Sequence, residues 1–465
     1  MARGDLALVL MAAGKGTRMR SRLPKVLHPV CGRPILMHAL ELGRELGATR
    51  RIVIVGSGEA EVREALAGQD VELVRQTEQL GTAHAALATR AALADHDGPV
   101  IVMNGDHPLY RPATLAALRD TWQEKKAGLA ILVTELPDPH GYGRVLRDAS
   151  GRVARVVEEK DCSDAERRVR EVNLGAYCAD RRALFELLAR VGNDNAKREY
   201  YITDLVELAL SSGHSVESST AADWRESLGI NTRAELAQAE SLLRERIAAQ
   251  LMADGVTLTH PETTFVDVDV RIGEDTVLAA GVTIRAGSRI GSGCRIEPGV
   301  VIEGATIGDD SHIKPGCFFE RGVRVGSRCE VGPNAHLRPG ADLRDDVRVG
   351  NYVEIKNSVL GNGTKADHLS YIGDADVGEG VTIGCGAITV NYDGAKKTRT
   401  TIGDRAFIGC NSNLIAPVTI EPEAYVAAGS TITKSVPGGA LAVARGQQRV
   451  IEGWRKKRFG DGSHE

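Results

Sequence analysis

Residues 272–301 read IGEDTV LAAGVT IRAGSR IGSGCR IEPGVV, and this repeat sets the architecture of the second half of the chain. Every sixth residue is aliphatic, and the residue four places later is usually small or thin. The register resumes after five-residue slips and continues to residues 426–431, VAAGST. Such a repeat stacks aliphatic side chains along an inner ladder, so it predicts a parallel β-helix. Coincidental glycine-rich β-structure is disfavoured because the register survives so many steps.

The chain before the repeats has a different pattern. Short β-branched runs alternate with helical stretches from residue 6 to about residue 220, which is typical of a parallel sheet covered by helices. We expect strands at residues 6–11, 52–55, 71–74, 100–103, 129–133, 153–157 and 172–178, and helices that include residues 84–93 and 114–126. Residues 233–252 contain no Gly or Pro and predict a helix that joins the two halves.

Length and composition limit the class of protein. The 465 residues are too many for one ordinary hydrophobic core. The 58 basic and 62 acidic residues nearly cancel, so no strong field attracts nucleic acid or an anionic membrane. Eight scattered cysteines without a CxxC pair argue against a zinc knuckle or a disulfide framework. Glycines and basic residues interrupt the apolar start too soon for a signal peptide or membrane span, so we expect a cytoplasmic protein without membrane insertion.

The segment LVLMAAGKGTRM, residues 8–19, is the first candidate site. Gly14 and Gly16 follow the first predicted strand, where backbone N–H groups can face a phosphate. Lys15, Arg18 and Lys25 add positive charge nearby. The segment matches neither the Walker A pattern nor GxGxxG, so neither NTP hydrolysis nor dinucleotide redox chemistry is supported. A simple glycine turn remains the alternative on these residues alone.

Asp106 follows the apolar run VIVM and is therefore expected at the carboxyl end of a strand, where ligands collect in open α/β sheets. A carboxylate there can hold Mg²⁺, which needs few protein ligands. Taken alone, Asp106 could equally be a turn or cap residue. Glu158, in VVEEK, could likewise be a solvated charge at a strand end.

The N-terminal motifs together resemble the sugar-nucleotide pyrophosphorylase family. Its signature LAAGxGTRM, followed by PK, is met by residues 11–19, with Met11 in place of Leu, and by Pro24 with Lys25. The resemblance implies catalytic roles for Lys25 and Arg18 and makes Asp106 and Asn231 the ligands of Mg²⁺. It implies that UTP and the UDP-sugar are bound by Met11, Ala12, Ala13, Gly14, Lys25, Gln76, Gly81, Thr82, Asn104, Gly105, Asp106, Gly143, Glu158, Asn173 and Asn231.

A second candidate site lies within the repeats. Arg338, Lys356, Tyr371 and Lys397 supply basic and hydroxyl groups that can hold a sugar phosphate. His368, in KADHLSYIGD, can take a proton from an attacking amine, with Glu354 as the candidate to orient its imidazole. The hexad rhythm breaks at residues 390–400, VNYDGAKKTRT, which predicts an external loop, and such loops often carry function.

The motifs HLSYIGDA and NYDG, with the order of both halves, closely resemble the bacterial bifunctional N-acetylglucosamine-1-phosphate uridyltransferase/glucosamine-1-phosphate acetyltransferase family over nearly the whole chain. The resemblance implies a Rossmann-like nucleotidyltransferase domain (residues 1–232), a linker helix (233–255) and a left-handed parallel β-helix acetyltransferase domain with a C-terminal tail (256–465). It also implies a homotrimer, formed through the β-helix, that uses acetyl-CoA and UTP to make UDP-N-acetylglucosamine.

The same resemblance assigns the residues of the acetyl-transfer site. His368 is the implied catalytic base. Glucosamine 1-phosphate is expected to bind Arg338, Lys356, Tyr371, Thr382 and Lys397. Acetyl-CoA is expected to bind Cys385, Asn391, Tyr392, Cys410, Ala428 and Arg445. A pyrophosphorylase whose β-helix only trimerises the chain remains the alternative, whereas a binding module without catalysis is disfavoured by Lys25, Asp106 and Asn231.

Several positions depart from the family pattern. Asn104 stands where Tyr is usual, Thr382 where Asn is expected, Cys385 in place of Ala and Cys410 in place of Ser. Asp367 replaces a small residue beside His368 and would raise the pKa of that imidazole if the two side chains approached. These departures bear more on the acetyl step than on the uridylyl step, and the two cysteines predict sensitivity of acetyl transfer to thiol reagents.

Overall fold

The computed structural model describes residues 5–460, which form two compact units divided between Arg246 and Ile247. The division falls within helix α8 (Arg233–Ala253), which confirms the predicted joining helix. Within residues 5–460, no helix combines the length and apolar character needed to cross a membrane. Each unit has its own core, so each is described separately.

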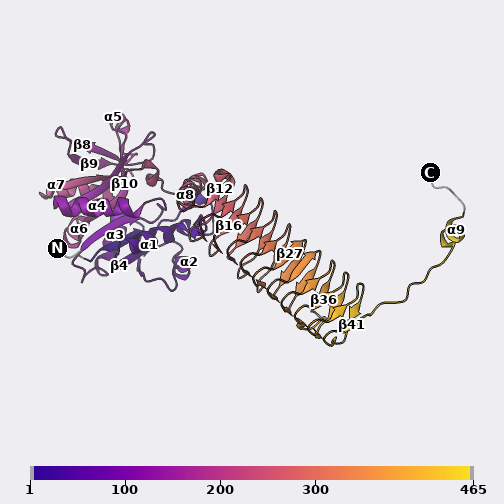
Figure 1. Cartoon of the computed structure of the whole chain (residues 1–465). Helices are drawn as coiled ribbons and strands as arrows, with labels where there is room; N and C mark the ends of the chain where they lie inside the picture. Colours follow the sequence, from indigo (N-terminus) through magenta and orange to yellow (C-terminus); the bar gives the residue numbers. More distant parts are fainter. Residues whose placement is uncertain (1–4, 461–465) are drawn as a thin grey trace. The chain divides into compact units, whose positions relative to one another are not determined.

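The first unit is built on a nine-stranded sheet with the strand order β11-β7-β10-β6-β1-β4-β5, to which β8 and β9 are attached beside β10 (Figure 1). Its strands are β1 (Ala7–Met11), β4 (Arg50–Val55), β5 (Glu72–Arg75), β6 (Pro99–Asn104), β7 (Leu129–Glu135), β8 (Arg144–Arg147), β9 (Val153–Val157), β10 (Glu171–Asp180) and β11 (Val216–Thr220). A separate ribbon pairs β2 (Pro29–Val30) with β3 (Arg33–Pro34). All seven predicted strands are present, whereas β8 and β11 were not predicted.

The expectation of a parallel sheet was wrong for two predicted strands: β10 runs antiparallel to both β6 and β7, and β9 runs antiparallel to β8. Parallel neighbours require a long crossover connection, usually a helix that covers the sheet. Between β7 and β10 the chain instead forms the hairpin β8–β9 and the short helix α5 (Asp164–Arg167). The chain therefore re-enters the sheet at the same end where β7 leaves it, and β10 runs back along β7.

Helices cover both faces of this sheet. One face packs against α1 (Ile35–Glu45), α2 (Glu59–Ala65) and α4 (Pro112–Lys125), and the other against α3 (Thr82–Leu87), α6 (Arg181–Leu188) and α7 (Leu205–Ser211). Leu8 and Leu10 of β1 belong to the first apolar layer, and Val9 belongs to the second. Because alternate residues enter different layers, the central strands are apolar on both sides. The predicted helix at 84–93 is α3 followed by a 3-10 turn at Ala88–Arg90.

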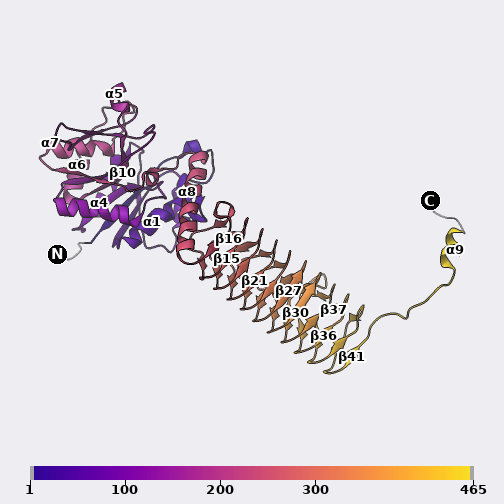
Figure 2. The same ribbon diagram turned by 45° about the horizontal axis from the view of Figure 1, so that its top comes forward.

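The second unit is a parallel β-helix whose coils stack regularly in Figures 1 and 2. The β12 sheet contains β12 (Thr257–Leu258), β15 (Val277–Leu278), β18 (Arg295–Ile296), β21 (His312–Ile313), β24 (Glu330–Val331), β27 (Arg348–Asn351), β30 (Lys365–His368), β33 (Thr382–Ile383), β36 (Phe407–Ile408), β39 (Tyr425–Val426) and β41 (Leu441–Ala442). The β13 sheet contains β13 (Phe265–Val266), β16 (Thr283–Arg285), β19 (Val301–Glu303), β22 (Phe318–Phe319), β25 (His336–Leu337), β28 (Glu354–Lys356), β31 (Tyr371–Gly373), β34 (Ile388–Val390), β37 (Asn413–Ile415) and β40 (Thr431–Ile432). The β14 sheet contains β14 (Arg271–Ile272), β17 (Arg289–Ile290), β20 (Thr306–Ile307), β23 (Arg324–Val325), β26 (Asp342–Leu343), β29 (Val359–Leu360), β32 (Ala375–Val377), β35 (Thr400–Ile402) and β38 (Val418–Ile420).

The hexads explain the inner ladders of this unit. Ile284 pairs with Ile302, three hexads later, and Ile302 pairs with Phe319 in the next coil. All three side chains are fully buried. A five-residue slip leaves the ladder intact, since Ile290 still pairs with Ile307. The predicted β-helix is therefore confirmed, and the predicted external loop lies between β34 and β35.

Candidate active sites

The first unit contains a cavity of about 430 Å³ at the carboxyl ends of β1 and β6. The two strands are parallel, and their last residues, Met11 and Asn104, are register partners. Ten residues of the predicted nucleotide-binding set line the cavity: Met11, Ala12, Ala13, Gly14, Lys25, Gln76, Gly81, Thr82, Asn104 and Asp106. The sheet therefore brings together motifs that are distant in sequence, at the edge where open α/β sheets bind ligands.

Lys25 forms hydrogen bonds with both predicted metal ligands, Asp106 and Asn231. Its Nζ donates to Asp106 Oδ2 at 2.5 Å and to Asn231 Oδ1 at 3.0 Å. The two oxygens thus converge on one cation, and the Lys25 ammonium is the group that they hold. Carboxylate and amide oxygens are also the donors that Mg²⁺ prefers, so this pair fits a divalent cation.

The Asp106 carboxyl is charged at neutral pH. Burial alone would raise its pKa, but the hydrogen bond and charge of His107 and the ammonium of Lys25 hold the pKa well below its usual range. His107 Nδ1 lies 2.8 Å from Asp106 Oδ1. Each carboxylate oxygen therefore has its own nitrogen partner.

The two glycines of the loop before Lys25 differ in the space around them. A Cβ added to Gly14 would meet no atom within 4 Å, so its backbone is accessible from the cavity. Gly16 has a φ of 57°, and a Cβ there would lie 2.7 Å from Lys25 Cβ. Gly16 therefore lets the loop pack against the stem of Lys25. Arg18 lies on the 3-10 turn Thr17–Met19, exposed to solvent, and does not line the cavity.

The loop that carries Gln76 and Gly81 of the predicted binding set is fixed by contacts on the side away from the cavity. The buried Gln76 side chain donates from Nε2 to the carbonyl oxygen of Gly81 at 3.1 Å. Gly81 has a φ of 125°, and a Cβ there would lie 2.4 Å from the backbone oxygen of Tyr200. The backbone of Tyr200 therefore fixes the loop that orients Gln76.

The remaining predicted residues do not line the cavity. Gly143 and Asn173 lie together, because Asn173 N donates to the Gly143 carbonyl at 2.9 Å. Glu158 accepts a hydrogen bond from Thr203 Oγ1 at 3.3 Å, and burial raises the pKa of its carboxyl. Gly105 N donates to the carbonyl oxygen of Met11 at 3.0 Å.

Six cavity residues lie outside the predicted binding set: Lys15, Thr17, Val26, Gln79, Ala85 and Glu199. Gln79 supports the glycine loop, since its Nε2 donates to the carbonyl of Ala13 at 2.9 Å. Lys15 was noted as nearby charge. Gln79 lies between Gln76 and Gly81 of the predicted set, whereas no motif pointed to Glu199.

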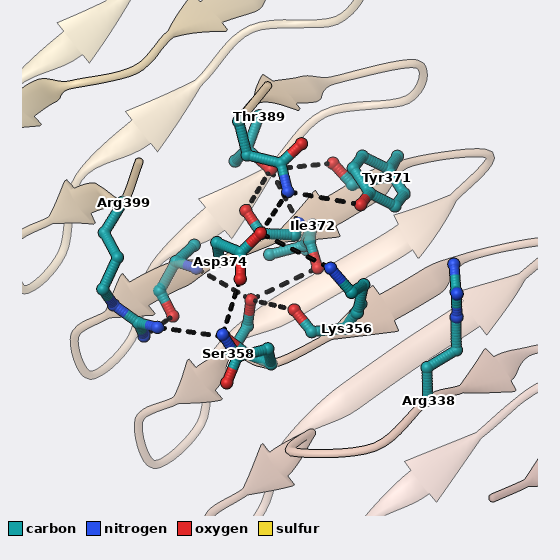
Figure 3. A network of polar contacts seen from close by, with 12 residues as sticks. Arg338, Lys356, Ser358, Tyr371, Ile372, Asp374, Thr389 and Arg399 are labelled. Carbon is teal, nitrogen blue, oxygen red and sulfur yellow. Dashed lines mark hydrogen bonds and ion pairs between the residues drawn. The ribbon is translucent and has the colours of Figure 1, made fainter. Parts of the chain in front are cut away.

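The second unit carries a cluster of polar side chains on neighbouring coils (Figure 3). Lys356 Nζ lies 3.6 Å from Asp374 Oδ2. Asn391 Nδ2 also donates to Asp374 and lies 3.4 Å from the Tyr371 hydroxyl. Arg338 donates to Glu354 Oε1 at 2.7 Å and stands apart from these contacts in Figure 3.

Lys397, from the external loop, adds a second ammonium beside Lys356. The contact and charge of Lys356 lower the pKa of Lys397. Burial would raise the pKa of Asp374, but hydrogen bonds from Asn357 and Asn391 and the charge of Lys356 lower it. Two adjacent ammonium groups with one carboxylate leave net positive charge, which suits a phosphate.

His368 belongs to a row of equivalent corner positions that follows the β12 sheet. Asn351 is its register partner, and the row continues in successive coils through Cys385, Cys410 and Ala428. The exposed His368 ring contacts Asn351 Oδ1 through Nδ1 at 3.0 Å. The imidazole and three predicted acetyl-CoA residues therefore lie along one edge.

The expectation that Glu354 orients His368 was wrong in this chain. Glu354 lies in the β13 sheet, where it accepts the hydrogen bond from Arg338, and Asn351 holds the imidazole instead. Asp367 forms its ion pair with Arg348 at 3.9 Å.

Five further residues of the predicted acetyl-transfer site lie in the β-helix unit. Arg445 donates to the carbonyl of Ala428 at 2.8 Å, which brings its guanidinium to the corner row. Tyr392 is exposed on the external loop, where its hydroxyl donates to Gly394 O at 2.7 Å. Thr382 pairs in register with Lys365 and Phe407. Cys385 and Cys410 are free thiols, and Cys410 is exposed.

Comparisons with known proteins cover both units. A family model described as MobA-like NTP transferase domain matches residues 8–200. A model described as bacterial transferase hexapeptide (six repeats) matches residues 269–304, 287–321 and 399–434. These matches agree with the fold of each unit.

Full-length relatives extend the match over both units together. The bifunctional protein GlmU of Listeria monocytogenes serotype 4b is 48% identical over 448 residues, which cover 96% of this chain and 97% of that protein. The bifunctional protein GlmU of Pelobacter propionicus is 46% identical over 452 residues, covering 97% and 98%. That of Brevibacillus brevis is 46% identical over 456 residues, covering 95% of each. The chain therefore belongs to the family of the bifunctional protein GlmU.

Proposed function

We propose that the chain is a bifunctional enzyme that makes UDP-N-acetylglucosamine. It acetylates glucosamine 1-phosphate with acetyl-CoA and then transfers a uridylyl group from UTP to N-acetylglucosamine 1-phosphate, with release of pyrophosphate. The observation that carries this proposal is the match to bifunctional relatives over 96% of the chain, with a polar site in each unit. Acetyl transfer belongs to the β-helix and uridylyl transfer to the first unit.

Uridylyl transfer needs no covalent intermediate on the protein. A phosphate oxygen of the sugar phosphate attacks the α-phosphorus of UTP in line, and the bond to the β-phosphate oxygen breaks. Asp106 and Asn231 would hold Mg²⁺, which when bound supplies charge neutralisation for the phosphates. Lys25 and the accessible backbone at Gly14 orient the triphosphate, because positioning and electrostatics dominate such transfers.

Acetyl transfer requires removal of a proton from the substrate amine. Asn351 Oδ1 can accept from His368 Nδ1–H, which leaves Nε2 with a free lone pair. As the amine nitrogen forms its bond to the thioester carbonyl carbon, Nε2 takes the amine proton, and the carbon–sulfur bond then breaks. The proton leaves with the CoA sulfur as a thiol. Lys356 and Lys397 hold the sugar phosphate.

We further propose that the β-helix forms a homotrimer and that the enzyme works in the cytoplasm. Large apolar side chains lie exposed on the coils at Tyr352, Leu369 and Tyr425. Exposed apolar surface of this kind is typical of an interface between subunits. Sedimentation of the full-length chain tests the trimer.

Two assays test the proposed function. Incubation of glucosamine 1-phosphate with acetyl-CoA should release free thiol, and UTP with N-acetylglucosamine 1-phosphate and Mg²⁺ should release pyrophosphate. Pyrophosphate release without thiol release would instead indicate a monofunctional pyrophosphorylase.

A further inference from the structure

The imidazole of His107 has no role in the chemistry above, although it contacts the candidate metal ligand. The residue is 7% exposed. Its Nδ1 lies 2.8 Å from Asp106 Oδ1, whereas Lys25 holds Oδ2. Asn231 Oδ1 contacts the same Lys25 ammonium. Oδ2 is therefore the Asp106 oxygen that points to the position where both predicted metal ligands meet a cation. His107 is thus the partner of the oxygen that faces away.

The ring of His107 is held on two sides. It stacks on the buried ring of Tyr110, with centroids 5.3 Å apart and planes within 6° of parallel. The Tyr110 hydroxyl is itself fixed by donation to the carbonyl of Leu174. Near another edge of the imidazole, a Cβ on Gly229 would lie 2.9 Å from Cε1 and Nε2. The ring therefore has one orientation, and position 229 requires glycine for this close approach.

Gly229 belongs to the turn that carries the second metal ligand. Ile230 N donates to the backbone carbonyl of Asp106 at 3.0 Å, and Asn231 follows directly. The turn is closed on its other side by Glu235, which accepts a hydrogen bond from Asn231 N at 2.7 Å. The imidazole thus packs between the two segments that supply the oxygen donors.

We propose that His107 is a positioning residue for divalent-cation binding in the uridylyl site, an inference that rests on the proposed function. It occupies Asp106 Oδ1, so that Oδ2, which contacts the Lys25 ammonium in this structure, is the oxygen that would ligate the metal, and it supports the turn that places Asn231. Hydrogen bonds to a ligating carboxylate typically contribute about 10- to 100-fold in metal affinity or activity. Mg²⁺ makes strict geometric demands, so a carboxylate with one oxygen already fixed suits it well.

The experiment uses the full-length chain and Mn²⁺ as the probe. Mn²⁺ is titrated at fixed UTP, without sugar phosphate, and binding is followed by water-proton relaxation. His107→Leu keeps an apolar side chain against Tyr110 but removes the N–H donor. It should raise both the Mn²⁺ dissociation constant and the Mg²⁺ concentration for half-maximal uridylyl transfer by about 10- to 100-fold.

Two further variants separate the hydrogen bond from packing. His107→Asn places an amide N–H near the position of Nδ1 and should restore Mn²⁺ affinity to within about threefold of the unmodified chain. Gly229→Ala leaves the imidazole intact but displaces the turn, and it should also weaken Mn²⁺ binding. The matched control is His96→Leu, at a buried histidine of the same unit that contacts the carbonyl of Pro99 at 3.2 Å. It should leave Mn²⁺ affinity unchanged.

Acetyl transfer, carried by the other unit, reports the amount of intact enzyme. Suppose that Asp106→Asn abolishes Mn²⁺ binding, as the proposed metal site requires. The role of His107 would then be overturned if His107→Leu lost no Mn²⁺ affinity, or if His107→Leu and His107→Asn lost it equally. Mn²⁺ binding that also survives Asp106→Asn would instead overturn the proposed metal site.

Discussion

Replacing Asp106 by Asn keeps the size of the side chain and removes its negative charge. In the unmodified chain both carboxylate oxygens face nitrogen donors, Lys25 at 2.5 Å and His107 at 2.8 Å. An amide has one oxygen and one N–H₂ group, so its nitrogen must face one of these donors. At least one contact is lost, together with the charge that would hold Mg²⁺.

The size of the effect follows from these losses. Removing one preorganised charge-stabilising group typically slows a reaction by about 10²- to 10³-fold, or about 3–4 kcal/mol. Loss of a charged metal ligand adds to this, so we expect uridylyl transfer to fall by about 10³-fold or more. The Lys25 and Asp106 side chains are only 11% and 18% exposed. Breaking this largely buried ion pair should lower the free energy of unfolding by about 3 kcal/mol.

The assay measures pyrophosphate release from UTP and N-acetylglucosamine 1-phosphate at saturating Mg²⁺, beside thiol release from acetyl-CoA. Thiol release should stay within about twofold of the unmodified chain, because the β-helix is a separate unit. Asp97→Asn is the control, since that carboxylate is 83% exposed and makes only a 3.9 Å ion pair. Retention of a tenth or more of the uridylyl activity in Asp106→Asn would refute the reasoning, as would a parallel loss of acetyl transfer.

Five other perturbations give distinct outcomes. His368→Ala should slow acetyl transfer by about 10²- to 10⁴-fold and leave pyrophosphate release unchanged, and equal thiol release in the two proteins would contradict its role as base. Lys397→Ala should raise KM for glucosamine 1-phosphate about tenfold. The contact with Lys356 lowers the pKa of Lys397, so that ammonium loses its proton at a lower pH than an ordinary lysine does. As the pH is raised, KM for glucosamine 1-phosphate should therefore begin to increase at a lower pH than it would with an ordinary lysine at this position. Lys397→Arg should abolish this rise, and an unchanged pH profile would exclude Lys397 from the phosphate site. Leu337→Ala, at a fully buried ladder position between Phe319 and Ile355, should lower the free energy of unfolding of the β-helix by about 2–5 kcal/mol, measured by urea denaturation. Chelation with EDTA should stop pyrophosphate release but leave thiol release intact, and loss of both would show that the metal has a wider role.

The β-helix could be predicted because its signal is local and repeated. Each hexad places one aliphatic residue inward, and the register of Ile284, Ile302 and Phe319 follows from counting. The same counting could have found Asn351 as the partner of His368, since the two are register neighbours in successive coils. Glu354 was chosen for its chemistry, and its place in a different sheet explains the error.

In the first unit, the strand directions and some of the cavity residues were harder to predict, because they depend on tertiary contacts. The direction of β10 depends on how residues between β7 and β10 fold, and apolar periodicity does not report direction. Glu199 reaches the cavity from a segment without a motif, because loop packing places it there. By contrast, the glycine loop and Asp106 were predictable because each follows the end of a strand, and Lys25 because it belongs to the motif that starts at Pro24.

A mixture of Asp106→Asn and His368→Ala chains tests most directly the claim that two independent sites act in sequence. The mixture receives glucosamine 1-phosphate, acetyl-CoA, UTP and Mg²⁺, and UDP-N-acetylglucosamine is measured. We expect almost no product from either variant alone and restored product from the mixture, with thiol release preceding pyrophosphate release. A mixture that stays inactive, or either variant forming product alone at the unmodified rate, would contradict the account.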